Sequence, residues 1–553
     1  MTGSVRPDTV SFTRKYLPAA IAACGAILLV VQWSWGRVLW LDEEMIAINI
    51  RDRSFHDLAG ALSLAQAAPY GWLALERALL LTLGGGERVL RIAPMLFGVA
   101  TLGGALWIGR RWMSAVGASA LVFLCAFGQW VAFHALELKH YSADTCFGLL
   151  LPALAVWAVE PDARFDRYRS RRIVAWWVAA AIAQWFSNGA LFVAPACAIV
   201  IVGAMMIREG LSGAVRAAAP GGLWLASFAA NYAVTLGPAL GSDFLRGYWA
   251  SSFPPSGIGV IGTLQWCVQQ LAPLADKPGG SGFGVVFWIV AAIGLFAAPG
   301  FPPAFRAIYL LVPFSAFALA AIRLVPTSER LGLWFVPALY VGVAMAAQAA
   351  AGLVSVRRAR ARVVRQAVGV AALVFLVVMA RDVFARGRIY ISLTPYESNH
   401  DFDDRSAIGW LARQRRAGDV WMAPYLSLPA IWWYAGPDAS TPAVEASFDS
   451  DRSACAGRDI DSWRARGDAR RALVYLGFGA DSPKEFVETL VSRLTTVGSV
   501  AAYRKYQAGH ALIIDLQTAQ ANPLTIQMLL DPAAPGAKPR ESGCILITPA
   551  RRW

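Results

Sequence analysis

Three carboxylates, Asp42, Glu43 and Glu44, directly follow a long apolar run in the stretch LWLDEEMIAINI, Leu39–Ile50. A carboxylate held at the mouth of an apolar segment can take a proton from a hydroxyl group, as a general base does. The same residues also suit a structural role, because Asp is a favoured N-cap and Glu in a first turn complements the helix dipole. Asp42 could serve in either role, or in both.

A second polar group lies in FHALELKHYSADT, residues 133–145, where two apolar runs meet. Such a density of ionisable residues exceeds what a solvated turn needs, and polar clusters at the mouth of a membrane span are candidates for function. Two arginines in IRLVPTSERLGLW, Arg323 and Arg330, form a third group, for which a structural role is the alternative. The second group consists of His134, Glu137, Lys139, His140, Tyr141 and Asp144.

Transfer of a sugar from a lipid phosphate needs both acids and cations. A carboxylate such as Asp42 would take the proton of the acceptor hydroxyl as that hydroxyl attacks the anomeric carbon. The departing phosphate needs fixed positive charge, which Arg provides with bidentate contacts and Lys as a point charge. The candidates for that charge are Lys139, His140, Arg323 and Arg330.

The elements that would hold these residues are membrane spans. Of the 553 residues 57% are hydrophobic and 16% charged, and the apolar residues gather in runs of roughly 17–23, as in a polytopic membrane protein. The first run lacks a small-residue cleavage site, so we interpret it as a retained span rather than a signal peptide. The predicted spans, about eleven in all, are 17–40, 90–109, 115–134, 142–159, 173–188, 190–207, 220–239, 281–298, 304–322, 331–353 and 366–383.

The distribution of arginine predicts the orientation. With these spans the arginine-rich loops near 109, 163, 208 and 357 all lie on the side of the N-terminus, which the positive-inside rule makes cytoplasmic. The net charge of +14 is therefore mostly topological and does not indicate a nucleic-acid partner. The opposite face holds residues 41–89, 136–144, 239–280, 323–332 and everything after about 384.

Two helices are expected outside the spans, in the first outer loop. Apolar residues recur at helical spacing over 43–65, which predicts a helix lying on the membrane surface with Asp42 at its start. The stretch 69–85 is apolar but short and carries Glu76 and Arg77, which favours a juxtamembrane or re-entrant helix.

A separate domain follows the last span. Short apolar runs at 419, 469 and 510 alternate with helical stretches such as RSAIGWLARQRR and PKEFVETLVSRLTTV, which predicts a small α/β domain outside the membrane. We therefore divide the chain into a transmembrane domain, 1–383, and a soluble domain, 384–553. Of the seven cysteines only Cys455 and Cys544, both in the second domain, are candidates for a disulfide.

In this order the motifs resemble the GT-C superfamily of polyprenyl-phosphate-sugar-dependent glycosyltransferases. The resemblance is to the bacterial family 39/83 type, with the protein O-mannosyltransferases and the aminoarabinose transferases. It is carried by LDEE after the first span, PYGW followed by GGGERVLRIAPMLFG, ELKHYSAD after the third span, SERLGLWFVP, and GDVWMAPYLSLPAIWWYAG with RRALVYLGF near the end. It implies an inverting transferase in a bacterial inner membrane, with a periplasmic C-terminal domain.

The resemblance also implies roles for single residues. Asp42 matches the catalytic aspartate of the first loop with Glu43 beside it, and Arg330 a position that would meet the lipid phosphate. The sequence departs from the pattern at Lys139 or His140, where many relatives have arginine, and at Glu44, where the residue is usually small. Glu137, Lys139 and Tyr141 fall on the second-loop motif, where Glu137, Tyr141 and Asp144 would be acid or substrate-binding residues.

Some GT-C enzymes use a divalent metal, and loop acids of this chain could hold one, but no obligatory cofactor is expected. The candidate acids are Asp42, Glu43, Glu137 and Asp144.

Two other functions are compatible with many membrane spans. A transporter or flippase of lipid-linked sugars predicts charges along a path near mid-membrane and a pseudo-symmetric repeat, whereas here the charges gather on one face. A non-catalytic scaffold whose outer domain binds glycans leaves Asp42 and Lys139 unexplained. The expected partners are a polyprenyl-phosphate-linked sugar and the bilayer, while neither sugar nor acceptor follows from the sequence.

Overall fold

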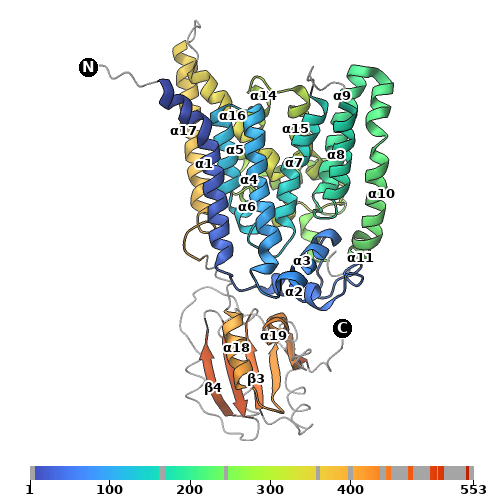
Figure 1. The fold of residues 1–553 in the computed structure, drawn as a ribbon, viewed down its shortest axis with the longest axis vertical. Coiled ribbons are helices and arrows are strands. Elements are labelled where there is room, and N and C mark those ends of the chain that lie inside the picture. Colours follow the sequence, from blue (N-terminus) through green and yellow to red (C-terminus); the bar gives the residue numbers. More distant parts are fainter. Residues whose placement is uncertain are drawn as a thin grey trace, which may run out of the picture. The chain divides into compact units, whose positions relative to one another are not determined.

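The computed structural model describes residues 7–160, 169–241, 247–355, 362–395, 403–435, 444–449, 471–477, 499–506, 509–515 and 544–546. The chain divides into two compact units. Unit 1 consists of Met1–Gly36 and Arg53–Tyr396, and unit 2 consists of Arg37–Asp52 and Glu397–Trp553. Unit 1 is a bundle of helices, and unit 2 contains a β-sheet with short helices (Figure 1). The short stretch that carries Asp42 thus belongs to the same unit as the C-terminal part of the chain.

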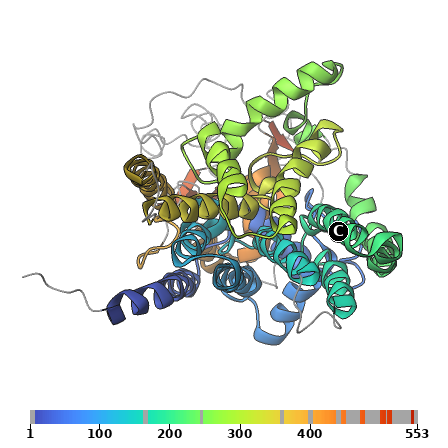
Figure 2. The same cartoon turned by 90° about the horizontal axis from the view of Figure 1, so that it is seen from above.

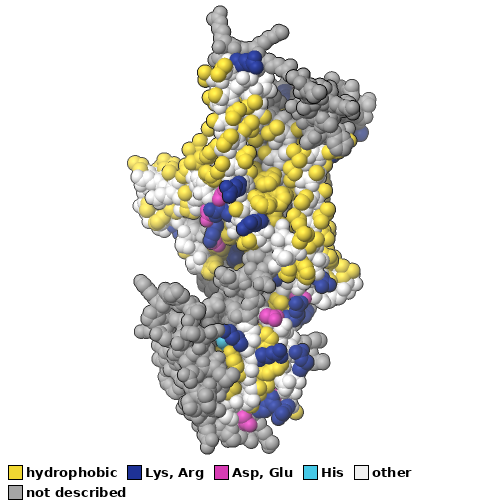
Figure 3. Space-filling view, turned by 90° about the vertical axis from the view of Figure 1, so that its left-hand side faces the viewer, with side chains coloured by type: hydrophobic (Ala, Val, Ile, Leu, Met, Phe, Trp, Pro, Cys, Tyr) yellow, Lys and Arg dark blue, Asp and Glu magenta, His cyan; other side chains and the backbone are white. Residues whose placement is uncertain are grey.

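Long apolar helices lie side by side in unit 1 (Figure 1), and several appear end-on when the bundle is viewed from above (Figure 2). Seven helical stretches of the described residues are long and apolar enough to cross a membrane. Hydrophobic side chains cover much of the face of unit 1 seen in Figure 3, as a lipid-facing surface requires. The α-helices of unit 1 are α1 (Pro7–Ser34), α3 (Tyr70–Leu83), α4 (Ile92–Trp112), α5 (Ala115–Phe127), α6 (Gln129–His134), α7 (Tyr141–Val159), α8 (Arg169–Ala183), α9 (Ala190–Ala218), α10 (Gly221–Asn231), α11 (Gly237–Leu240), α13 (Gly259–Asp276), α14 (Val285–Ala297), α15 (Pro303–Ala321), α16 (Val336–Val354) and α17 (Arg362–Gly387).

A helix lies at each position where the sequence predicts a span, although several ends differ. α1 begins at Pro7 and ends at Ser34, earlier at both ends than the predicted 17–40. In the predicted hairpin α8 ends at Ala183, whereas α9 runs on to Ala218 across a kink at Gly210, where φ is +67°. Hydropathy marks the apolar part of a helix, and polar turns can extend it at no cost outside the membrane.

The predicted span 115–134 is interrupted at Gly128, where α5 ends and α6 begins. A Cβ at this glycine would meet the Oη of Tyr340 and would lie 2.7 Å from the carbonyl oxygen of Leu124. Tyr340 is itself held there, because its hydroxyl donates to the carbonyl of Gly279 at 3.1 Å. The break gives α6, and with it His134, a direction of its own.

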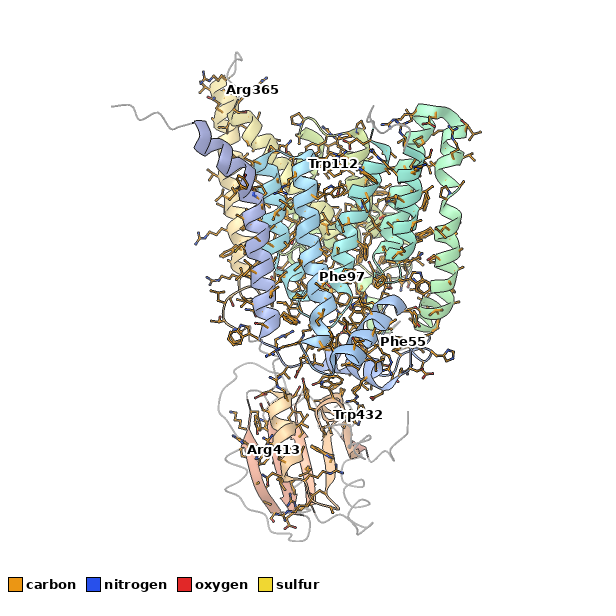
Figure 4. The ribbon with its side chains drawn as sticks, in the orientation of Figure 1. Phe55, Phe97, Trp112, Arg365, Arg413 and Trp432 are labelled. Atoms are coloured by element: carbon orange, nitrogen blue, oxygen red, sulfur yellow. The ribbon has the colours of Figure 1, made fainter. Side chains whose placement is uncertain are left out.

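The described residues of the arginine-rich segments near 109 and 208 lie at one end of unit 1, as the sequence predicts. Arg111 in the last turn of α4 pairs with Glu160 after α7 at 2.6 Å, and Arg208 of α9 donates to the carbonyl of Val159. Trp112 and Arg365 lie toward this end, and Phe55 lies at the other (Figure 4). That the arginine-rich end faces the cytoplasm stays a prediction.

Of the two helices predicted in the first outer loop, α3 forms at the expected place. The surface helix predicted over 43–65 is wrong in its second half, because α2 (Leu41–Asp52) ends at Asp52. Beyond it the Arg53 guanidinium donates to the carbonyls of Asp57 and Ala61 at 3.1 and 2.8 Å and to Ser63 Oγ at 2.6 Å. These bonds replace a helical ladder with a compact turn.

Unit 2 holds a six-stranded mixed sheet of order β4-β5-β3-β1-β2-β6, in which β1 pairs in parallel with β2 and β3 and the remaining pairs are antiparallel. The α/β prediction is confirmed, with β1, β3 and β5 at the three predicted runs and α18 at RSAIGWLARQRR. PKEFVETLVSRLTTV and Cys455 lie outside the described residues, and only the backbone of Cys544 is described, so the disulfide stays a prediction. The elements of unit 2 are α2 (Leu41–Asp52), α18 (Asp404–Gln414), β1 (Val420–Pro424), α19 (Leu428–Tyr434), β2 (Val444–Asp449), β3 (Arg471–Leu476), β4 (Ser499–Lys505), β5 (His510–Asp515) and β6 (Cys544–Leu546).

The helices of unit 2 are held by apolar contacts and a side-chain cap. Ile408 and Leu411 of α18 and Ile431 of α19 are fully buried in one hydrophobic cluster with the sheet. Asp403 caps α18, since its carboxylate accepts from the N–H of Ser406 at 3.2 Å. The next residue, Asp404, therefore starts the helix in a fixed place.

Candidate functional site

The turn between α6 and α7 holds a buried group of ionisable side chains at the end of the bundle opposite the arginine-rich loops. None of them is more than 6% exposed, although an isolated charge is costly to bury, so each needs a partner. Arg330, from the loop before α16, completes the group. We define the polar cluster as His134, Glu137, Lys139, His140, Tyr141, Asp144 and Arg330.

Glu137 is the anion of the polar cluster. Its carboxylate pairs with the imidazole of His134 three residues earlier. Burial by itself would raise the pKa of Glu137, but the charges of His134, Arg330 and Lys139 outweigh it and hold the pKa below its usual value. Glu137 is therefore ionised and counterbalances part of the positive charge around it.

Lys139 reaches Gln66, which the sequence analysis did not single out. The Nζ of Lys139 donates to the side-chain oxygen of Gln66 at 2.6 Å, and both residues are buried. The one signal for Gln66 was an amide in an otherwise small and apolar stretch, SLAQAAP. Gln66 also lines a small hollow together with Thr235, Pro238 and Ala239.

His140 is neutral at physiological pH. Burial lowers its pKa to about 3, and the charges of Lys139, His134 and Arg330 act in the same direction. Its Nε2 lies 3.2 Å from the amide nitrogen of Asn188 in the α8–α9 turn. If His140 contacts a phosphate, it does so as a neutral hydrogen-bonding group and not as the fixed charge that the sequence suggested.

Asp144 in the first turn of α7 binds the turn between α8 and α9. It accepts from the hydroxyl of Ser187 at 2.7 Å and from the N–H of Gly189 at 2.9 Å. Glycine is needed at 189 because a Cβ there would meet the side chain of Trp334. Asp144 therefore joins three helices at the mouth of the bundle, which is a role in assembly that the sequence did not indicate.

Of the two predicted arginines, Arg330 alone belongs to the polar cluster. Its guanidinium lies over the rings of Tyr141 and Trp249 at 5.8 and 5.7 Å, and its charge acts on Glu137 and His140. Arg323 instead donates to the carbonyl of Pro254 at 2.7 Å and to Ser256 Oγ at 2.9 Å. Arg330 is half-buried, and contact with the two rings orients its guanidinium.

Asp42 and Glu43 start α2, which is part of unit 2, whereas the polar cluster is part of unit 1. The Oε2 of Glu43 accepts from the backbone N–H of Trp40 at 3.2 Å and lies 3.8 Å from the guanidinium of Arg37. This is the backward half of a capping box, so Glu43 stabilises the helix start. Asp42 is half-buried beside it and remains the candidate base.

The predicted acids do not form a metal site by themselves. Within the part of the chain that the structure describes, no group of three or more His, Cys, Asp or Glu side chains could hold a metal ion. Metal dependence of the reaction stays an open prediction.

Comparison with known proteins rests on structure alone, since no protein-family model and no curated protein sequence matches the chain. ArnT from Cupriavidus metallidurans in the apo state is 14% identical with a TM-score of 0.51, and the match covers 93% of this chain and 99% of ArnT. The Archaeoglobus fulgidus oligosaccharyltransferase tethered with an acceptor peptide is 13% identical with a TM-score of 0.52, over 90% of this chain and 74% of that one.

The chain has the GT-C fold. Archaeal AglB, from Archaeoglobus fulgidus and in complex with an inhibitory peptide and a dolichol-phosphate, matches with 12% identity and a TM-score of 0.50, over 90% of this chain and 74% of AglB. The match to ArnT covers nearly the whole of both chains, so the similarity is not confined to the helices of unit 1. The predicted fold is thereby confirmed.

Proposed function

We propose that this protein is a membrane glycosyltransferase that moves a sugar from a polyprenyl-phosphate donor to a hydroxyl acceptor, with inversion at the anomeric carbon. The observation that carries the proposal is the convergence of Lys139 and Arg330 on one buried cluster at the mouth of an apolar bundle with the GT-C fold. A lipid phosphate combines an anionic head with an apolar tail, and this arrangement offers a place for each.

Two basic side chains of the polar cluster support an anionic ligand. The charges of Lys139 and Arg330 both act on the ionised Glu137, and His140 is neutral. Arg330 presents a planar fork of N–H donors that suits phosphate oxygens, while Lys139 adds a point charge deeper in the cluster. Preorganised cations of this kind stabilise the negative charge that builds up on a departing phosphate.

The reaction needs one proton acceptor and no acid. The acceptor oxygen attacks the anomeric carbon, its proton passes to the carboxylate of Asp42, and the bond from the anomeric carbon to the phosphate oxygen breaks with its electron pair going to the phosphate. A single displacement of this kind inverts the anomeric configuration. Glu43 is engaged at the start of α2, which leaves Asp42 as the base on this helix.

The comparisons are consistent with a lipid carrier as donor. Archaeal AglB has been solved with a dolichol-phosphate, and AglB shares the GT-C fold with this chain at a TM-score of 0.50. We propose that the polar cluster faces the periplasm of a bacterial inner membrane, because Arg111 and Arg208 of the arginine-rich segments lie at the opposite end of the bundle. The domain division at 383 and 384 and the periplasmic place of the C-terminal domain belong to the same proposal.

The test uses the full-length protein in detergent or nanodiscs with polyprenyl-phosphate sugars as donors. Mass spectrometry of the lipid that copurifies identifies the carrier, and radiolabelled sugar follows transfer to membrane lipids, polysaccharide or protein. Asp42→Asn should lower turnover by about three orders of magnitude or more while leaving donor binding intact, as expected for loss of a general base. Glu43→Gln is the matched control and should affect stability more than turnover.

Full turnover by Asp42→Asn would remove Asp42 as the base. Counterflow of a lipid-linked sugar across the membrane of proteoliposomes, without transfer to any acceptor, would instead favour the transporter or flippase. A copurifying lipid without a phosphate would argue against the donor class.

A further inference from the structure

The helix that carries Asp42 is built into unit 2 at both of its ends. The N–H of Leu39, before α2, donates to the hydroxyl of Tyr434 at 2.9 Å. At the other end Arg51 donates to the carbonyl of Trp432 at 2.9 Å, and its guanidinium lies 5.2 Å from the ring centre of Trp433. Tyr434, Trp432 and Trp433 all lie in α19, so this helix of unit 2 contacts α2 at both ends.

A pair of buried acids fixes α2 between these ends. Glu44 is 1% exposed and hydrogen-bonds to Asp404, the first residue of α18, which is 3% exposed. Asp404 also accepts a hydrogen bond from the hydroxyl of Tyr475 in β3. Burial, followed by the charges of Asp404 and Glu43, raises the pKa of Glu44 well above its usual value. The raised pKa favours the protonated form of Glu44, which can donate a hydrogen bond to Asp404.

The bond to Asp404 orients Asp42 through the geometry of the helix. Successive residues of an α-helix are turned by about 100°, so side chains two positions apart point to nearly opposite sides. With Glu44 anchored in the core of unit 2, Asp42 is turned away from that core. The exposures agree, because Glu44 is buried while Asp42 is half-buried.

We propose that Glu44 and Asp404 are a positioning pair, which fixes the rotation of α2 about its axis and so aims the carboxylate of Asp42 at the acceptor hydroxyl. Unit 2 then contributes directly to sugar transfer, because it positions the proposed base Asp42. This role explains why the chain has glutamate at position 44, where the family resemblance implies a small residue. It rests on the proposed role of Asp42 as the base.

The anchoring itself can be tested without any activity. Glu44→Ala removes the donor to Asp404, whereas Glu44→Gln supplies an amide N–H in its place. In hydrogen–deuterium exchange of the full-length protein, the amides of Leu41–Asp52 should exchange about tenfold faster or more in Glu44→Ala and near the wild-type rate in Glu44→Gln. Arg413→Ala, on the exposed part of α18 that Figure 4 labels, is the control and should leave these amides unchanged.

The positioning role is tested by turnover. Glu44→Ala should lower kcat by about tenfold to a hundredfold with the KM for the donor unchanged, since a base that is misaimed by about 1 Å still leaves the donor site intact. Glu44→Gln should restore most of the kcat. Asp404→Asn keeps an acceptor for Glu44 and should resemble Glu44→Gln, so it provides a second reading if Glu44→Ala folds poorly.

Three results would overturn the inference. The first is unchanged exchange of Leu41–Asp52 in a folded Glu44→Ala protein, which would mean that the acid pair does not hold α2. The second is faster exchange with full turnover, and the third is a loss of turnover that Glu44→Gln does not rescue. Failure of the proposed function looks different, because Asp42→Asn would then be fully active while the exchange results stand.

Discussion

The Nζ of Lys139 donates a 2.6 Å hydrogen bond to the side-chain oxygen of Gln66, which lies 73 residues earlier in the chain. Both side chains are buried, and a buried ammonium that has lost its hydration depends on such acceptors. The bond ties the segment between α2 and α3 to the turn between α6 and α7. Gln66 thus holds the lysine that is proposed to face the phosphate.

Replacement of Gln66 tests this bond. Gln66→Leu keeps the size of the side chain but removes the acceptor, which should cost about 1–3 kcal/mol of stability. Thermal unfolding in detergent measures this as a lower midpoint. Gln66→Glu keeps an acceptor and adds an opposite charge, so it should unfold at or above the wild-type midpoint. Equal midpoints for Gln66→Leu and the wild type would show that the bond contributes little.

The two arginines of the late outer loop should differ in their effect on donor binding. Arg330→Ala removes one of the two basic side chains proposed to bind the phosphate and should weaken binding of a polyprenyl phosphate by about tenfold or more. Arg330→Lys should lie in between, because it keeps the charge without the planar fork. Arg323→Asn should change affinity less than about twofold. Asn suits the φ of +58° at position 323, so this control adds no strain.

Binding of a fluorescent or radiolabelled polyprenyl phosphate to purified protein measures these affinities. Equal losses in the Arg323 and Arg330 variants would mean that both arginines contact the donor and that Arg323 leaves Pro254 when it binds.

Glu76 of α3 gives a prediction about pH. Its side chain is fully buried, and neither carboxylate oxygen has a hydrogen-bond partner among the described residues. Burial raises the pKa of Glu76 well above its usual value. Because the folded-state pKa is raised above the unfolded one, the contribution of Glu76 to stability is fully present below the unfolded pKa and is lost as pH rises through the folded pKa.

Glu76→Gln removes this titration and keeps the shape of the side chain. The variant should therefore unfold at a higher temperature than the wild type toward pH 8–9, with the two curves converging toward pH 4–5, near the unfolded pKa of about 4.3. Thermal unfolding over this pH range is the measurement, and Glu329→Gln, which alters an exposed carboxylate, is the control. A constant difference across the range would contradict a neutral Glu76.

Close packing at the mouth of the bundle depends on Gly148 of α7. A Cβ at this position would meet the backbone of Trp334, which cannot move as a flexible side chain could. Gly148→Ala should therefore lower stability by about 1–3 kcal/mol, as overpacking does. Gly103 of α4 has no atom within 4 Å of where its Cβ would lie, so Gly103→Ala should be neutral or stabilising by up to about 1 kcal/mol. The thermal unfolding midpoints of the two variants measure this difference, and equal midpoints would contradict the prediction.

Local signals in the sequence were enough to locate the helices and the polar cluster. A bilayer requires about 20 consecutive apolar residues for each span, so the apolar runs in the sequence locate the spanning helices directly. The sequence also predicted that the ends of α4 and α7, which meet through Arg111 and Glu160, lie on the same side of the membrane. The reason is again local, because the charge at the end of a span indicates its topology. Apart from Arg330, the polar cluster lies within one short segment of the chain, residues 134–144, so its location needed no long-range information.

Only the tertiary structure decided which distant residues meet. Gln66 reaches Lys139, Ser187 reaches Asp144, and Arg330 rather than Arg323 reaches the cluster, none of which follows from spacing along the chain. The membership of α2 in the C-terminal unit, through Glu44 and Asp404, is a pairing over about 360 residues. Hydropathy and periodicity report on neighbours in sequence, whereas these pairings are selected by packing and by the cost of leaving a buried polar group without a partner.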